Sequence, residues 1–111
     1  MAAVKTDRLY RGERMKDATV VTVHVAPGEH RPLGGDDAPG FDWGRPTPGA
    51  LALTDALAAD VFGDSATPGL RERLFHDVVL RLPFIEPWVV WHAALEEWAE
   101  RQPAGSPRVA G

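Results

Sequence analysis

The N-terminal part of the chain alternates between hydrophobic and polar positions with a period of two, which is the period of a β-strand. Residues 19–25, with the sequence TVVTVHV, are almost all β-branched and place three valines on one face. Residues 8–14 indicate a shorter strand. Residues 30–33 indicate a short edge strand, because Pro32 cannot donate a hydrogen bond to a neighbouring strand. The pattern therefore predicts a small antiparallel sheet of two or three strands.

From residue 48 onward the hydrophobic residues recur every three to four positions, which is typical of amphipathic helices. The first helix is predicted to run from Pro48 to a stop at Gly63, the second over about 68–82, and the third from Pro87. A threonine stands before each of the first two proline starts, where its side chain can cap the helix: Thr47 and Thr67.

The third predicted helix carries a stripe of large hydrophobic residues, namely Trp88, Trp91, Leu95 and Trp98. We expect Trp91 and Leu95 to lie in the core. Neither a one-faced strand pair nor three unpartnered helices would be stable alone, so the two groups are expected to pack together. The predicted fold class is α+β, in the order ββ(β)ααα, with a two- or three-stranded antiparallel sheet packed against three helices.

Length and composition describe an ordinary globular protein. A chain of 111 residues with 44% hydrophobic and 25% charged residues predicts one domain, over residues 1–102, followed by a disordered tail over residues 103–111. No apolar run is long enough to cross a membrane and no secretory signal is recognisable, which favours the cytoplasm. The bias toward Ala, Gly, Pro, Asp and Arg is typical of a high-GC source such as an actinobacterium or its phage.

The charge is unevenly distributed. Residues 1–16 hold five Lys and Arg against two acidic residues, and the remainder holds seven Arg against fourteen acidic residues. Since nucleic-acid binding depends on neutralising phosphates, the acidic body argues against it, and weak contact through the basic N-terminus is the third hypothesis. The simpler interpretation is that the basic segment is an edge strand whose exposed side is charged.

The loop FDWGRPTPGALAL, residues 41–53, leads directly into the first helix. Two interpretations remain open. The stretch Trp43–Gly49 could bind a small anionic ligand at the helix N-terminus, or serve a minimal enzyme there, through Trp43, Gly44, Arg45 and Thr47. However, its two prolines remove backbone N–H groups and no Lys follows, unlike a phosphate loop. We therefore favour a structural elbow, in which Trp43 is buried under the sheet and Gly44 allows a close backbone approach.

Catalytic and metal-binding patterns are weak in this sequence. There is no cysteine, and no ordered Ser-His-Asp set is recognisable. The pair His92 and Glu96 has the spacing of metal ligands on a helix, but such pairs more often stabilise helices. Asp60 is expected to pair with an Arg. We expect no catalytic residue, no metal and no cofactor, and the sequence favours a protein that is not an enzyme.

The tryptophans suggest a protein partner instead. Four Trp in 111 residues exceed what so small a core can hide completely, and Val89 and Val90 lie outside the predicted Trp stripe. Exposed apolar patches of this kind mark partner surfaces. The first hypothesis is an interaction module that binds a protein or a second copy of itself through the C-terminal helix, using Trp88, Val89 and Val90 with a polar rim that includes Glu97.

The segments FDWGRPTPGALALTDALAADVFGD, LRERLFHDVVLRLP and WVVWHAALEEWAE resemble a small uncharacterised domain family of bacteria and phages. The family pattern is roughly F-x-W-G-x-x-G-x-G-P-x-x-L-A-x-A-I-L, followed by a helix and a Trp before a closing helix. The resemblance covers about residues 8–101. Here the loop reads RPTPG in place of a more glycine-rich run. Because the family has no known function, the resemblance implies a fold and no chemistry.

Overall fold

The computed structural model describes residues 8–16, 18–26, 28–34 and 40–102. The predicted tail over residues 103–111 lies outside this part of the chain. In chain order the described elements are β1 (Leu9–Arg14), β2 (Thr19–Ala26), β3 (Glu29–Pro32), α1 (Pro48–Phe62), α2 (Pro68–Asp77), β4 (Trp88–Trp91) and α3 (His92–Glu100). Two 3₁₀ turns occupy Gly63–Ser65 and Val79–Arg81. The α+β fold class is confirmed, with four strands in place of the two or three expected.

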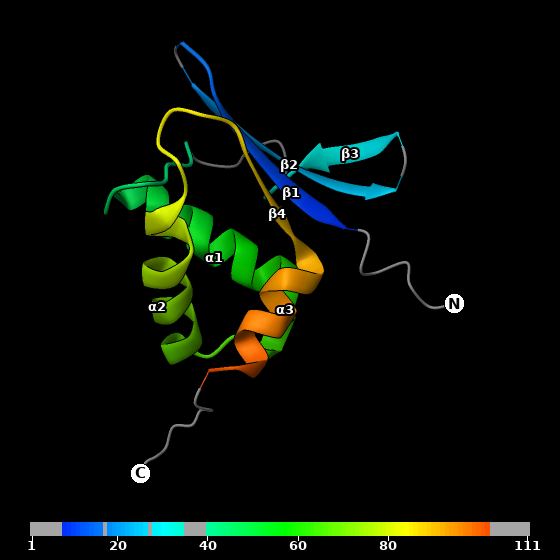
Figure 1. The fold of residues 1–111 in the computed structure, drawn as a ribbon, viewed down its shortest axis with the longest axis vertical. Helices are drawn as coiled ribbons and strands as arrows, with labels where there is room; N and C mark the ends of the chain where they lie inside the picture. The colour runs from blue at the N-terminus through cyan, green and yellow to red at the C-terminus, as the bar shows by residue number, and fades with distance from the viewer. Residues whose placement is uncertain (1–7, 17, 27, 35–39, 103–111) are drawn as a thin grey trace.

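The four strands form one antiparallel sheet in the order β3-β2-β1-β4, and the helices cover one of its faces (Figure 1). The inner face carries Tyr10, Val21 and Val23, which are all buried. The interpretation of the basic segment as an edge strand is wrong for β1. Because β4 pairs with its second edge, β1 lies in the interior of the sheet.

The predicted helix signals of α1 and α2 are confirmed. Thr47 and Thr67 are the N-caps, and each side chain accepts a hydrogen bond from the backbone N–H three residues on. Gly63 ends α1 with a positive φ of 56°. The second helix is shorter than predicted. It ends at Asp77 and the chain tightens into a 3₁₀ turn, in which the Val79 carbonyl accepts a hydrogen bond from the Gly44 N–H.

The predicted start of the third helix at Pro87 is wrong. Residues 88–91 form β4, and α3 begins at His92. The strand pairs with β1 and places Trp88 opposite Gly12, where the indole ring covers the space that a side chain at residue 12 would occupy. Trp91 is consequently 49% exposed and does not lie in the core, whereas Leu95 is buried as expected.

The core lies between the sheet and the helices. Its fully buried large side chains come from every layer of the fold: Tyr10, Val23, Leu33, Trp43, Leu53, Leu57, Leu74 and Val79. Trp43 and Trp88 meet edge to face with their ring centroids 5.3 Å apart, which joins the loop before α1 to β4. The core thus fixes both the loop and β4, the two regions in which the sequence predicts binding residues.

Candidate functional site

The loop before α1 bends at Gly44, whose φ is +79°. A side chain at this position would be strained, and its Cβ would lie 3.1 Å from the Leu82 carbonyl oxygen. Trp43 is fully buried and Phe41 is buried beside it. The structure therefore bears out the structural interpretation of this loop, in which aromatic side chains fill the core and Gly44 permits a close backbone approach.

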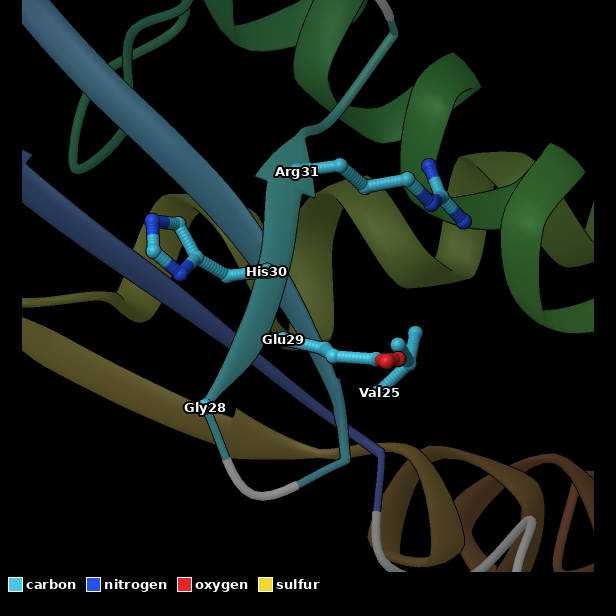
Figure 2. A pocket seen from close by; sticks show the side chains of 5 residues that line it. All are labelled: Val25, Gly28, Glu29, His30 and Arg31. Carbon is cyan, nitrogen blue, oxygen red and sulfur yellow. The ribbon is translucent and has the colours of Figure 1, made fainter.

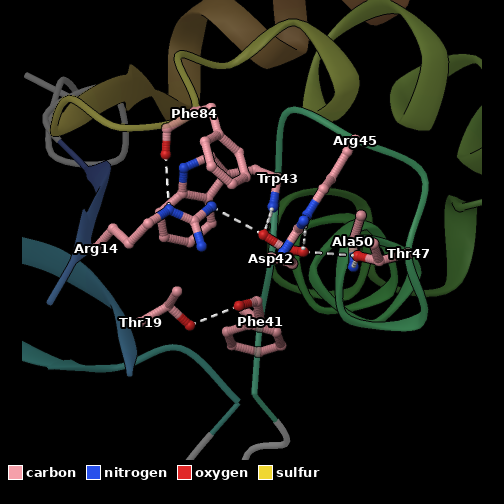
Figure 3. Close-up of polar contacts among 9 residues, drawn as sticks. All are labelled: Arg14, Thr19, Phe41, Asp42, Trp43, Arg45, Thr47, Ala50 and Phe84. Atoms are coloured by element: carbon pink, nitrogen blue, oxygen red, sulfur yellow. Dashed lines mark hydrogen bonds and ion pairs between the residues drawn. The ribbon is translucent and has the colours of Figure 1, made fainter. Parts of the chain in front are cut away.

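Asp42 is the centre of the polar contacts in this loop (Figure 3). Its carboxylate accepts hydrogen bonds from Arg14 at 2.8 Å, Arg45 at 3.0 Å, Thr47 Oγ1 at 2.9 Å and the Trp43 backbone N–H at 2.8 Å. Burial alone would raise the pKa of Asp42, but hydrogen bonds led by that from Arg14 outweigh it and hold the pKa well below its usual range. We call Asp42 with these four residues the Asp42 junction.

Arg14 connects the Asp42 junction to a third segment of the chain. Its Nε donates to the Phe84 carbonyl oxygen at 2.7 Å, and its guanidinium lies 4.0 Å from the centre of the Phe84 ring. Arg45 also lies over the Phe84 ring, at 4.9 Å. Strand β1, the loop before α1 and the segment before β4 are therefore held together by one arginine.

The residues predicted to bind an anion are brought together here, but around a carboxylate of the chain itself. Trp43 is buried, Gly44 shapes the bend, Arg45 pairs with Asp42, and Thr47 caps α1 while donating to Asp42. Asp42 thereby supplies the negative charge that the loop and the helix N-terminus attract. The sequence analysis did not single out Asp42. Its place between Phe41 and Trp43, five residues before the cap, is a local feature that does not reveal the contact with the distant Arg14.

A second carboxylate, Asp60, has its own set of donors near the C-terminal end of α1. It accepts hydrogen bonds from Tyr10 Oη at 2.6 Å, Arg31 at 2.9 Å and Arg8 at 3.2 Å. Burial by itself would raise the pKa of Asp60, but the Tyr10 and Arg31 hydrogen bonds lower it below its ordinary value. The prediction that Asp60 pairs with an Arg is confirmed. We call these four residues the Asp60 junction.

The histidines do not converge on a site. His92 is buried at the start of α3, where its ring stacks on Tyr10 at 6.3 Å and its Nδ1 lies 3.6 Å from Glu96 Oε1. His24 and His30 stack on each other across β2 and β3, with ring centroids 5.2 Å apart. Within the part of the chain that the structure describes, no group of three His, Asp or Glu residues could hold a metal ion.

A shallow hollow follows the hairpin of β2 and β3 (Figure 2). It is lined by Val25, Gly28, Glu29, His30 and Arg31, with His30 on one side of β3 and Arg31 reaching toward α1 on the other. Arg31 is already engaged by Asp60, and Glu29 and His30 are exposed. The hollow thus offers an open surface and no buried polar group aimed at a ligand.

Strand β4 holds three of the four residues that the sequence assigned to partner binding. Trp88 is buried and Val90 is partly buried, both on the inner face, whereas Val89 is 51% exposed on the outer face. Trp91, which the sequence placed in the core, joins Val89 on that outer face. The fourth residue, Glu97, lies on α3 with its carboxylate 4.0 Å from Arg101.

The arginines in the described part of the basic N-terminal segment form ion pairs within the fold. Arg8 pairs with Asp60 and Arg14 with Asp42, and Arg11 lies 4.0 Å from Glu13. Residues 1–7, which contain Lys5, lie outside the described part of the chain. No helix among the described residues is long and apolar enough to cross a membrane.

The fold and site define a small α+β domain in which two polar clusters join the sheet to the helices and the edge strand β4 exposes Val89 and Trp91. The model of the Family of unknown function (DUF6166) matches residues 10–101, and the chain belongs to this family. No curated protein and no solved structure matches the chain. The family membership agrees with the resemblance seen in the sequence and supplies no activity.

Proposed function

We propose that this chain is a small protein-interaction module whose binding surface is β4. The observation that carries the proposal is that Val89 and Trp91 stand about half exposed, side by side on the outer face of a strand at the edge of the sheet. Exposed aromatic and β-branched side chains on an edge strand favour docking of another protein, since they offer both apolar surface and backbone hydrogen-bonding groups.

The contrast with the other edge of the sheet supports this assignment. Strand β3 carries Glu29, Arg31 and Pro32, which are charged or proline residues of the kind that discourage strand pairing. Strand β4, with the sequence WVVW, carries neither a charge nor a proline. The sequence analysis placed the binding surface on the C-terminal helix, and we now place it on β4. Trp91 takes the place of Trp88 in this surface, and Glu97 on α3 remains a residue of its polar rim.

Site-specific photocrosslinking in the native host tests the proposal. A photoreactive residue at position 89 is expected to give protein crosslinks, and the same residue at position 51 is the matched control. Leu51 is 53% exposed, close to the 51% of Val89, but it lies on α1 in the helical layer. Equal crosslinking from both positions, or none from position 89, would contradict an interaction surface at β4.

A further inference from the structure

We infer that the partner of β4 is a second copy of this chain, paired antiparallel through β4 about a two-fold axis at Val90. This inference rests on the proposed function, because it takes β4 as the binding surface and adds the identity of the occupant. In such a dimer the two four-stranded sheets become one continuous sheet. Strand β3 lies at the edge of each sheet opposite β4, so the two β3 strands would be the edge strands of the continuous sheet (Figure 1).

The hydrogen-bond phase of β4 determines which of its backbone groups face outward. His92 N–H donates to the Arg8 carbonyl at 2.9 Å, so Arg8 and His92 form a hydrogen-bonded pair. Two residues further along each strand, Tyr10 lies opposite Val90. In an antiparallel ladder, alternate pairs exchange hydrogen bonds. The backbone groups of Val90 therefore face β1, whereas the N–H and C=O groups of Val89 and the N–H group of Trp91 point away from it. The Trp91 carbonyl belongs to α3, because Trp91 is the N-cap and its carbonyl accepts the first hydrogen bond of that helix.

These outward groups are complementary to their own copy. With Val90 opposite Val90 of the second chain, each Val89 lies opposite a Trp91, and in each pair the Trp91 N–H can donate to the Val89 carbonyl of the other copy. Two backbone hydrogen bonds can form in this register, one in each pair. The same register places Val89 and Trp91 side chains together on the outer face, and pairs of aromatic with β-branched side chains are among the favourable cross-strand contacts.

Charge also favours a second copy. Two-fold pairing brings each strand against itself, so a charged residue near the axis would approach its own duplicate. The four residues of β4 carry no charge, and this repulsion is therefore absent. Strand β3 differs. Its register with β2 turns the backbone N–H and C=O groups of Arg31 toward β2, so the outward position falls to Pro32, which has no N–H to donate. Pairing through β4 alone closes at two copies.

The expected association is weak. A strand of four residues buries much less than the roughly 1,200 Å² of a standard protein interface, so the monomer and dimer should exchange with concentration. Sedimentation velocity on the full chain is therefore run as a concentration series up to about 1 mM, where weak complexes are populated. The average mass is expected to rise from monomer toward dimer and not beyond.

Two double variants test the pairing register. Val89→Lys/Trp91→Lys places Lys opposite Lys in both pairs, whereas Val89→Lys/Trp91→Glu places Lys opposite Glu. Both change the same two exposed side chains, so any general effect on folding is shared, and circular dichroism checks it. The Lys/Lys variant is expected to dimerise at least about tenfold more weakly than the Lys/Glu variant. Equal dimerisation of the two variants would overturn the register.

Disulfide trapping provides a second measurement that tolerates weak association. The chain contains no cysteine, so Val90→Cys introduces one thiol per copy. Opposite residues in a pair that is not hydrogen-bonded have Cα atoms about 4.5 Å apart, within the range of a disulfide. Val90→Cys is expected to form a covalent dimer rapidly under mild oxidation, whereas the control Leu51→Cys is not. Equal rates for both variants would overturn the pairing at Val90.

The outcomes separate this inference from the proposed function. A chain that stays monomeric at every concentration, and yet crosslinks from position 89 to a different protein, overturns the self-pairing and leaves the interaction surface standing. Crosslinks from position 89 to the chain itself, with a mass that stops at two copies, support both. An absence of crosslinks from position 89, together with a monomer throughout, overturns both.

Discussion

Asp42 is the residue on which the loop before α1 depends. It is largely buried and accepts charge-assisted hydrogen bonds from Arg14 and Arg45. Asp42→Asn keeps the shape and removes the charge, and we expect it to lower the free energy of unfolding at neutral pH by about 1–3 kcal/mol. Urea unfolding measures the loss. Asp55→Asn is the matched control, because Asp55 is an exposed carboxylate on α1 and should change stability by less than about 0.5 kcal/mol.

The pH dependence of this difference has a defined sign. The pKa of Asp42 is lower in the folded chain than its ordinary value of 3.8, so the folded state holds the charged form more strongly. The stabilisation is therefore fully present above that ordinary value and is lost as the pH falls through the folded pKa. The stability difference between wild type and Asp42→Asn should stay constant near neutrality and shrink below about pH 4. A constant difference down to the acid transition would contradict this assignment.

Tyr10 provides a spectroscopic test at the alkaline end, because it is the only tyrosine in the chain. Burial and the hydrogen bond to Asp60 raise the pKa of Tyr10 above its ordinary value of 10.0. The resulting stabilisation is present below that value and is lost as the pH rises above it. We expect the ultraviolet absorbance of the phenolate to appear together with alkaline unfolding. An ionisation that precedes the loss of circular dichroism would contradict a buried Tyr10.

Strand β4 divides its two tryptophans between the faces of the sheet, and their substitution should have very different effects. Trp88 is buried against Gly12 and Trp43, so Trp88→Ala should cost about 3–5 kcal/mol of stability. Trp91 is half exposed, and Trp91→Ala in the monomer should cost less than about 1 kcal/mol. Urea unfolding at low concentration separates the two. Similar losses would show that residues 88–91 do not alternate between the faces.

The elements with strong local signals could be predicted from the sequence. Helices α1 and α2 begin where a capping threonine precedes a proline, and α1 ends at a glycine with positive φ. These signals act within a few residues and need no tertiary information. The valine alternation of β2 is equally local, and its inner face is the one that the sequence indicates.

Strand β4 could not be distinguished in the same way. Trp88 and Trp91 are three residues apart, a spacing that puts both on one stripe of a helix but on opposite faces of a strand. The deciding interaction is the pairing of Trp88 with Gly12, which is distant in sequence. The Asp42 junction was missed for a related reason, because its strongest partner, Arg14, lies 28 residues away. Local patterns could not reveal either contact.

At the scale of the whole molecule, α1 is joined to β1 near both of its ends. Asp42 lies just before the helix and binds Arg14 at the end of β1, while Asp60 lies near the helix C-terminus and binds Arg8 just before β1. The two junctions share no residue. Helix and sheet are thus held in register by two separate charge clusters with the core between them.

This arrangement predicts that the two junctions contribute independently to one cooperative unfolding transition. Asp42→Asn, Asp60→Asn and the double variant should each unfold in a single step, and the two losses in free energy should add within about 0.5 kcal/mol. Urea unfolding followed by tryptophan fluorescence and by circular dichroism gives both the free energies and the number of steps. Losses that fall well short of additivity would mean that breaking one junction already releases the other. Transitions that differ between the two probes would mean that the sheet and the helices unfold separately. That result would contradict a helix α1 held to β1 by the two junctions.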